Sequence, residues 1–206
     1  TLISLGPEGF RDALRAGLAM GADKAVQLLD PAFDNVDFLT VSRLLARAIL
    51  SLGFDLILCG RQAVDDDMAQ VGPALAVHLD IPCVTAVTQL DFSDDWNQAT
   101  VSRQIEGGSE IIESALPILL SCQKGLNQPR LPSFKGIMAA KKKQIEIFDA
   151  DKLGFDPNAP NDTTSTVIES GLTLPSSRDK GVILDGSISD AVTSLVKSLR
   201  DTEKVV

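Results

Sequence analysis

The residues best suited to chemistry lie in one short stretch, which runs from Gly60 to Val71 as GRQAVDDDMAQV. It follows an apolar run of strand length at 55–59 and leads into a stretch of helical length at 69–79. In open α/β sheets, ligands bind where a strand passes into the next helix. The unpaired N–H groups at a helix N-terminus are suited to phosphate. The position of this stretch therefore predicts an anion or nucleotide site.

The three consecutive aspartates limit how this stretch can bind a phosphate. Their carboxylates would repel a phosphate group, so we expect the backbone at 69–71 to make the contact. The aspartates would then hydrogen-bond a ribose or fix the turn. A plain helix-capping cluster is an equally good interpretation, because the stretch is neither a P-loop nor a dinucleotide glycine motif. The candidate binding residues are Gly60, Arg61, Gln62, Ala63, Val64, Asp65, Asp66, Asp67, Met68, Ala69, Gln70 and Val71.

A second stretch, PRLPSFKGIMAAKKK at 129–143, combines apolar side chains with a lysine triplet. Its prolines predict a loop that presents Phe134. An exposed aromatic side chain with flanking charge is typical of a hot spot for protein binding. The other interpretation is that Phe134 packs into the domain while the lysines form a solvated face. The candidate docking residues are Phe134, Ile137, Met138, Lys141, Lys142 and Lys143.

Composition narrows the classes of function. The net charge of −9 argues against nonspecific binding to nucleic acid, which needs a basic surface. His78 is the only histidine and the three cysteines are widely spaced, so we expect no metal site, disulfide framework or Ser-His-Asp triad. No apolar run reaches the length of a membrane span. Free thiols within apolar runs indicate a reducing compartment, such as a bacterial cytoplasm.

Two hydrophobic periods alternate over the first 124 residues. Apolar runs of strand length alternate with stretches of helical period. The run at 55–59 is predicted to be a buried strand. The expected strands are 1–5, 25–29, 55–59, 84–90 and 117–122, and the expected helices are 10–18, 38–52 and 69–79. This alternation predicts an α/β fold, a three-layer αβα Rossmann-like parallel sheet. Residues 100–105 and 110–114 flank a glycine pair and predict a β-hairpin.

The sequence changes character after residue 124. Residues 125–180 are rich in Pro, Asn, Asp, Ser and Thr, with a short β-like patch at 144–148. Apolar residues still punctuate this segment, so we predict a long C-terminal arm that packs on another protein. Apolar residues at helical spacing from Ile188 to Leu199 predict that the arm ends in a helix. The predicted division is a nucleotide-binding domain at 1–124 and a recognition loop with a C-terminal arm at 125–206.

Four segments together resemble the beta subunit of electron-transferring flavoproteins in their order and spacing: DLILCG, GRQAVDDDMAQVGP, VSRQIEGGSEIIE and PRLPSFKGIMAAKKKQIEIF. The opening SLGPEGFRDALRAGLAMGADKAVQL is also similar to that family, so the resemblance covers essentially the whole chain. It implies a subunit that pairs with an alpha subunit holding most of a flavin adenine dinucleotide (FAD). Because the flavin carries the redox chemistry, the resemblance implies no catalytic acid, base or nucleophile in this chain.

The resemblance also implies a ligand for the first stretch, at 60–71. Family members bind an adenine nucleotide through the segment that matches 60–71, with a further contact at the turn that matches Leu5. That nucleotide is AMP in many members and a second FAD, reduced by NADH, in the electron-bifurcating branch. The wording AQVGP at 69–73 is similar to the flavin-carrying branch, whereas Asp66 within the triple aspartate is similar to the AMP type. The balance leans toward a second FAD, with AMP as the alternative.

The resemblance also implies binding partners for the second stretch, at 129–143. The segment that matches 131–143 is the family's recognition loop, which anchors partner dehydrogenases, and Phe134 falls where that loop presents its apolar anchor. The implied partners are the alpha subunit, acyl-CoA or other dehydrogenases, and a quinone oxidoreductase. The chain departs from the family because an upstream segment, which includes the first strand and part of the nucleotide site, is missing.

Two alternative functions remain beside the electron carrier. One is a bifurcating subunit that oxidises NADH at a beta-bound FAD. The other is a free-standing adenine-nucleotide-binding module, which predicts a self-sufficient monomer and leaves the apolar arm unexplained.

Overall fold

The structure is a computed structural model, and it describes residues 1–156, 158–159, 162, 167, 170–171, 173–177 and 180–205 of the chain. The chain divides into two compact units, Thr1–Ile168 and Glu169–Val206. Parts of the predicted arm at 125–206 lie outside the described residues.

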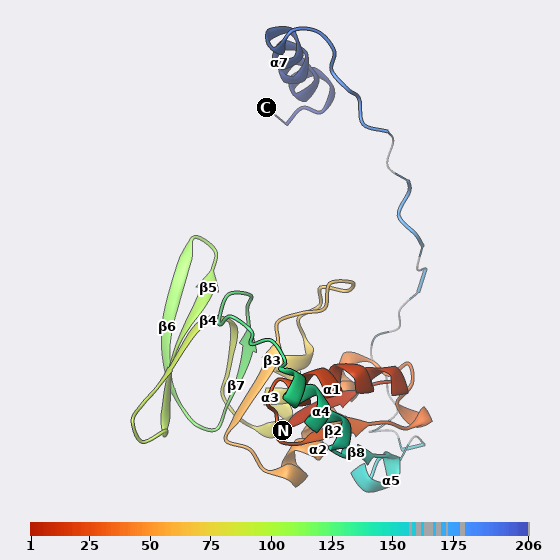
Figure 1. Ribbon diagram of the computed structural model, residues 1–206, viewed down its shortest axis with the longest axis vertical. Helices are drawn as coiled ribbons and strands as arrows, with labels where there is room; N and C mark the ends of the chain where they lie inside the picture. Colours follow the sequence, from red (N-terminus) through yellow and green to blue (C-terminus); the bar gives the residue numbers. More distant parts are fainter. Residues whose placement is uncertain are drawn as a thin grey trace. The chain divides into compact units, whose positions relative to one another are not determined.

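Strands and helices alternate along the first unit, as the hydrophobic periods predict (Figure 1). Its strands are β1 (Leu2–Leu5), β2 (Ala25–Leu28), β3 (Leu56–Gly60), β4 (Cys83–Phe92), β5 (Gln98–Ile105), β6 (Gly108–Ala115), β7 (Ile118–Cys122) and β8 (Ile145–Phe148). Its helices are α1 (Arg11–Ala19), α2 (Phe38–Leu52), α3 (Val71–Leu79), α4 (Phe134–Lys142) and α5 (Ala150–Leu153). Short 3-10 turns at Glu8–Phe10 and Pro31–Phe33 precede α1 and α2.

The strands form two sheets. The first is all parallel, in the order β1-β2-β8, and the second has the order β3-β7-β4-β5-β6. In the second sheet β3, β7 and β4 are parallel, whereas β5 pairs antiparallel with both β4 and β6. The predicted α/β class and the hairpin are therefore confirmed, and the parallel strands fall into two sheets. Strand β8 joins the first sheet beside β2, so this sheet uses residues beyond 124.

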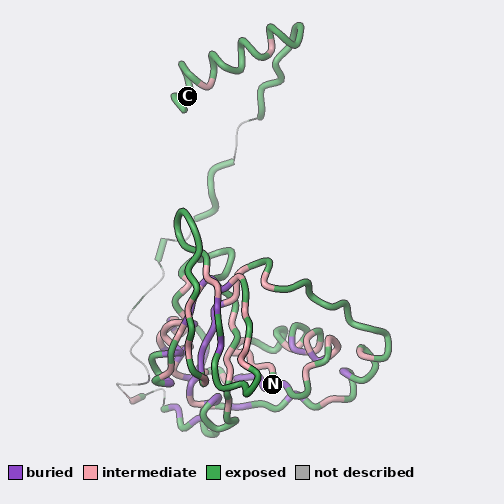
Figure 2. Tube along the Cα trace, turned by 90° about the vertical axis from the view of Figure 1, so that its left-hand side faces the viewer, coloured by how far each residue is buried: buried purple, intermediate pink, exposed green. Residues whose placement is uncertain are grey.

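Helices cover both faces of the first sheet, which gives it three layers. Alternate side chains of a strand point to opposite faces. Ala25 of β2 packs against α1 and α4, whereas its neighbour Val26 packs against α2 and α5. Figure 2 shows buried, purple stretches in the interior of the first unit and exposed, green ones on its loops. The same alternation orders the second sheet, where Leu119 of β7 faces α2 and α3 and Leu120 faces β5.

Strands β1 and β3 are edge strands, each paired on one side only within the described chain. Leu58 of β3 is 55% exposed. The prediction that 55–59 is a buried strand is therefore wrong, because its apolar residues have no further strand to pack beside. A cavity of about 400 Å³ lies along these two edges, lined by Thr1 and Ile3, by the end of α2 and by 53–58.

The recognition loop predicted around Phe134 is in fact a helix. Ser133 caps α4 by accepting a hydrogen bond from the N–H of Gly136 at 3.0 Å. The two prolines that suggested a loop both precede this cap, at Pro129 and Pro132, where they do not interrupt the helix. Helix α4 lies side by side with α1 (Figure 1).

Asp162 joins the end of the first unit to α2. Arg47 donates hydrogen bonds to both its carboxylate oxygens, at 2.6 and 3.2 Å, and the N–H of Asp156 donates a third at 3.1 Å. Burial of this carboxyl works against its charged form. The hydrogen bonds from Arg47 and Asp156, with the charges of Arg47 and Arg43, nevertheless hold the pKa of Asp162 below its ordinary value.

The variant Asp162→Asn is expected to lower the free energy of unfolding by about 1–2 kcal/mol at pH 7, because Arg47 then loses its charged acceptor. A carboxyl whose pKa is lowered by folding stabilises the protein above its unfolded-state pKa, and this contribution disappears as the pH falls through the folded-state pKa. Urea unfolding at pH 7 and at low acidic pH should therefore show a difference from wild type that shrinks in acid. Asp94→Asn, which changes an exposed aspartate in the β4–β5 turn, is the control. A difference that stays equal at both pH values would contradict this account.

Among its described residues the second unit contains one regular helix, α7 (Ile188–Lys197), followed by a π-helical turn at Ser198–Thr202. Ser187 and Asp190 form a capping box at its start, with the Ser187 hydroxyl accepting from the Asp190 N–H at 3.3 Å. The terminal helix predicted from the apolar spacing is confirmed. Apolar side chains along it are exposed, namely Ile188, Val192, Leu195 and Val196. No helix in the described part of the chain is long and apolar enough to span a membrane.

Candidate functional site

A cavity of about 320 Å³ opens where β3 leads into α3. This is the position at which open α/β sheets place their ligands. The lining residues come from the end of β3, the following loop, the first turn of α3 and the start of α2, and they are Phe38, Cys59, Gly60, Arg61, Gln62, Ala63, Asp66, Met68, Ala69, Gln70, Val71 and Gly72.

The N-terminus of α3 supplies the cavity with unoccupied hydrogen-bond donors. Gln70 precedes the helix, and its side chain does not cap it. The first N–H groups of a helix have no partner within the helix, so those of Val71 and Gly72 are available to a ligand. They carry the positive end of the helix dipole, which favours an anion such as a phosphate.

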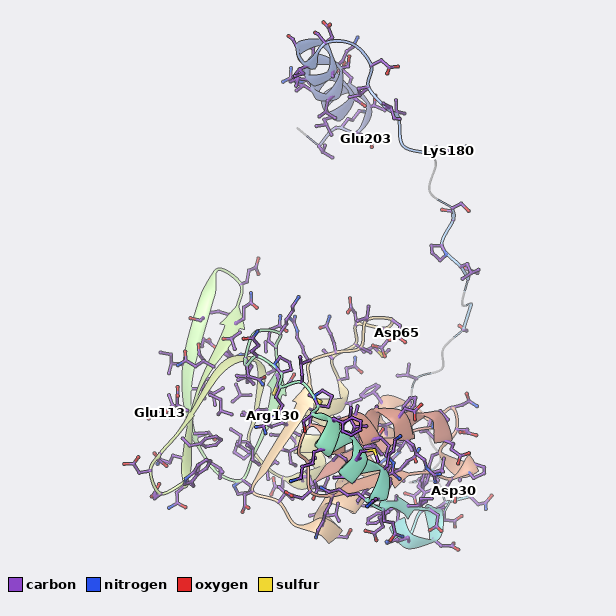
Figure 3. The ribbon with its side chains drawn as sticks, in the orientation of Figure 1. Asp30, Asp65, Glu113, Arg130, Lys180 and Glu203 are labelled. Atoms are coloured by element: carbon purple, nitrogen blue, oxygen red, sulfur yellow. The ribbon has the colours of Figure 1, made fainter. Side chains whose placement is uncertain are left out.

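The three aspartates of the loop are turned mainly to the loop itself. Asp65 accepts a hydrogen bond from the N–H of Asp66, and Asp66 accepts one from the N–H of Met68, each at 3.1 Å. Gln62 donates to Asp67 at 2.6 Å. Figure 3 shows Asp65 on the loop that stands out between β3 and α3. These contacts are turn-fixing bonds of the kind predicted for the aspartates.

Two residues of this loop have an uncommon backbone conformation. Asp67 and Ala69 both adopt left-handed φ values, of 53° and 55°. Residues other than glycine rarely adopt this backbone conformation, which costs of order 1 kcal/mol of free energy per residue. Residues held in it cluster at ligand-binding sites. Ala69 and Gln70 directly precede α3 and line the cavity.

Gly72 brings α3 into close contact with the sheet. A Cβ added at Gly72 would lie 2.9 Å from Sγ of Cys59 and 3.6 Å from Cδ2 of Leu119. The absence of a side chain at this position therefore sets how near the helix N-terminus approaches β3. Burial, with smaller contributions from Cys122 and Cys83, raises the pKa of Cys59 to about 12. The Cys59 thiol is consequently protonated at neutral pH and packs as a small apolar group.

The second candidate surface is the outer side of α4. Phe134 is 81% exposed, and Ile137 and Met138 are 40% and 44% exposed. Lys141 and Lys142 are exposed on the last turn of the same helix. These five residues, the α4 face, combine an apolar anchor with positive charge, which is the composition of a protein-docking surface.

The electron transfer flavoprotein domain family matches residues 1–153 of the chain. The electron transfer flavoprotein beta subunit of Thermoanaerobacterium thermosaccharolyticum is 43% identical over 200 residues, which cover 97% of this chain and 76% of that protein. The chain belongs to the electron transfer flavoprotein beta-subunit family. The beta subunit of Bacillus subtilis is 37% identical and matches 100% of this chain and 79% of its own length. The resemblance expected from the sequence motifs is thereby confirmed.

A further relative is named as part of a larger complex. Subunit CarD of the caffeyl-CoA reductase–Etf complex of Acetobacterium woodii is 38% identical over 202 residues, covering 97% of this chain and 76% of that subunit. The electron transfer flavoprotein beta-subunit family therefore includes a member of a complex that contains a reductase.

Most of the sequence-predicted binding residues of this electron transfer flavoprotein beta-subunit chain meet in one cavity. Val64, Asp65 and Asp67 are in the loop but do not line the cavity, and neither does Leu5 at the end of β1. The turn after Leu5 is held by Gln27, whose amide donates to the carbonyl oxygens of Gly6 and Pro7 at 3.2 and 2.8 Å.

Three lining residues, Phe38, Cys59 and Gly72, were not among the predicted ones. Cys59 lies one position before the predicted stretch, at the end of β3. It was interpreted as a core residue because the neighbouring residues in the sequence are apolar. Phe38 is the first residue of α2, next to Asp37, which caps α2 by accepting from the N–H of Thr40 at 2.9 Å. Asp37 is the sequence feature that could have pointed to Phe38, because it marks the start of a second helix, α2, whose first residue lines the same cavity.

The docking residues separate into two groups. Lys143 does not join the α4 face, because its ammonium donates to the carbonyl oxygen of Ala22 at 2.7 Å. Lys141 and Lys142 have no such contact in the described structure and remain exposed. Among the described residues no cluster of histidine, cysteine, aspartate or glutamate is arranged to hold a metal ion.

Proposed function

We propose that this electron transfer flavoprotein beta subunit binds an adenine nucleotide in the cavity between β3 and α3. We propose further that it passes electrons through a flavin held with an alpha subunit, and docks partner dehydrogenases through the α4 face. The observation that carries the proposal is the uncapped N-terminus of α3, which opens into a cavity at the end of a parallel strand. The bound flavin supplies the redox chemistry, and the chain supplies binding and orientation.

The donors and the lining suit an adenine nucleotide. The N–H groups of Val71 and Gly72 are available to a phosphate at the dipole end of α3. Phe38 and Met68 provide apolar surface for the adenine ring. Asp65 does not line the cavity, and Asp66, which does, has one carboxylate oxygen bonded to the N–H of Met68.

AMP and a second FAD share this chemistry. The name of the Acetobacterium woodii relative, part of a reductase complex, is the observation that favours the second candidate function, NADH oxidation at a beta-bound FAD. On the AMP alternative the nucleotide is structural. The free cysteines Cys59, Cys83 and Cys122 support a reducing compartment such as a bacterial cytoplasm.

The partners follow from the same assignment. The exposed apolar anchor and the two lysines of the α4 face support docking of an acyl-CoA dehydrogenase or a related dehydrogenase. The exposed apolar stripe of α7 supports packing of the C-terminal arm on the alpha subunit. A quinone oxidoreductase is the acceptor that we propose downstream.

Strands β1 and β3 each leave one side unpaired within the described chain. We propose that a further strand pairs along these edges and completes the nucleotide site. The cavity along these edges and the unpaired outer sides of both strands support this view. A strand in that position would also cover Leu58.

Purification together with the alpha subunit tests the proposal. The protein should be isolated as a heterodimer that carries FAD, and its flavin should be reduced by a purified acyl-CoA dehydrogenase supplied with octanoyl-CoA. Reduction by NADH alone would support the bifurcating candidate. Isolation as a self-sufficient monomer without flavin or an alpha subunit would contradict the proposal and favour a free-standing nucleotide-binding module.

A further inference from the structure

The inner side of α4 is fastened closely to α1. Ala140 is 1% exposed and packs with Leu14 and Leu18 of α1. At Gly136 the two helices approach so closely that an added Cβ would overlap the carbonyl oxygen of Ala19. Any larger residue at Gly136 would therefore push α4 away from α1.

Two basic side chains join the C-terminal end of α4 to α1 and to the residues just after it. The guanidinium of Arg15, on α1, donates to the carbonyl oxygens of Ala140 and Lys143. The last carbonyl groups of a helix have no partner within it and carry the negative end of the dipole, so a cation is favoured there. In return, Lys143 donates from its ammonium to the carbonyl oxygen of Ala22, just beyond α1, at 2.7 Å. We call Arg15 and Lys143 the α1–α4 clamp.

The clamp determines where the α4 face lies. A helix of nine residues is too short to hold its conformation alone, so its position depends on tertiary contacts. Phe134 is at the first position of α4 and is 81% exposed, so its own side chain anchors the helix little. Helix α4 contacts α1 at Gly136 and again around Ala140 and Lys143, so a shift at the Lys143 end tilts the helix about Gly136 and moves Phe134.

We propose that Arg15 is a positioning residue for partner docking. It touches neither the α4 face nor the cavity, and it acts by holding α4 at the angle that presents Phe134. This inference rests on the proposed function of α4 as the docking helix. Both hydrogen bonds come from one guanidinium nitrogen, Nη1, which the long arginine side chain carries to the two carbonyl groups.

The heterodimer with the alpha subunit is the protein to test, with a purified acyl-CoA dehydrogenase and octanoyl-CoA as the electron donor. Arg15→Gln should raise the KM for the dehydrogenase about fivefold, while kcat at saturating dehydrogenase and the flavin content stay near wild type. Arg15→Lys should give an intermediate KM, because it keeps the charge and the N–H donors but on a shorter side chain. Arg11→Gln is the matched control: Arg11 is on the same helix but bonds Glu8 and Gln27 in place of α4.

A double variant distinguishes positioning from a general loss of stability. If Arg15 acts through Phe134, Arg15→Gln should have little further effect on KM in a Phe134→Ala background. Effects that multiply, or an Arg15→Gln variant with unchanged KM beside an impaired Phe134→Ala variant, would overturn the inference and leave the docking role of α4 intact. An unchanged KM in Phe134→Ala itself would instead overturn the proposed docking function, and with it the role of Arg15.

Discussion

Replacing Phe134 with alanine is expected to raise the KM for an acyl-CoA dehydrogenase about 30-fold, which corresponds to about 2 kcal/mol of lost binding free energy. The side chain is 81% exposed in the free chain and has Ile137 and Met138 beside it on the same helix. A partner that covers this surface removes the whole phenyl ring from water, and aromatic anchors of this kind dominate interface energies. The measurement is the rate of flavin reduction against dehydrogenase concentration.

The cofactors should be unaffected by this change, because Phe134 is not among the residues that line the β3–α3 cavity. Nucleotide and flavin contents of Phe134→Ala should therefore equal those of wild type. Leu50→Ala is the matched control, since it removes another exposed apolar side chain, 62% exposed, from a helix without a proposed docking role. A KM that changes equally in both variants would show that exposed apolar surface in general, rather than the α4 face, is being measured.

Replacing Gly72 with valine is expected to weaken adenine-nucleotide binding at least about tenfold. A Cβ at this position already lies 2.9 Å from Cys59 Sγ, and the two further methyl groups leave no arrangement that avoids Cys59 and Leu119. Helix α3 must then move away from β3, and its free N–H groups leave the positions that suit a phosphate. The measurement is the nucleotide retained per heterodimer after gel filtration.

Two further variants show whether crowding is the cause. Gly72→Ala should have a smaller effect, and Gly72→Ala combined with Cys59→Ala should recover binding, because removing Sγ makes room for the new methyl group. Gly108→Val is the control, since a Cβ there meets nothing within 4 Å. Full nucleotide retention in Gly72→Val would contradict the proposed role of the α3 N-terminus.

The sequence could predict the parts of the fold that depend on local patterns. The apolar run at 55–59, the glycine after it and the periodic stretch up to Leu79 were enough to place a strand, a loop and a helix. Because that order alone locates the binding edge of an α/β sheet, most of the cavity-lining residues were predicted. The turn-fixing bonds of the aspartates were among the predicted contacts, because their carboxylates would repel a phosphate group.

The features that were missed depend on contacts between distant residues. Leu58 is exposed because β3 has no strand on its outer side, and strand order is invisible to a single-strand pattern. Lys143 looked like a third docking cation, but its partner Ala22 lies far away in the chain. Helix α4 was taken for a loop because its capping residue Ser133 follows a proline and its first turn contains Gly136. The tight fit against α1 explains that glycine.

The adenine nucleotides released from the purified heterodimer, counted and identified by mass, test the central claim most directly. Our account predicts one adenine nucleotide per heterodimer in addition to the FAD held mainly by the alpha subunit, either AMP or a second FAD, and its loss in Gly72→Val. A heterodimer that transfers electrons normally yet releases a single FAD and no other adenine nucleotide would contradict it.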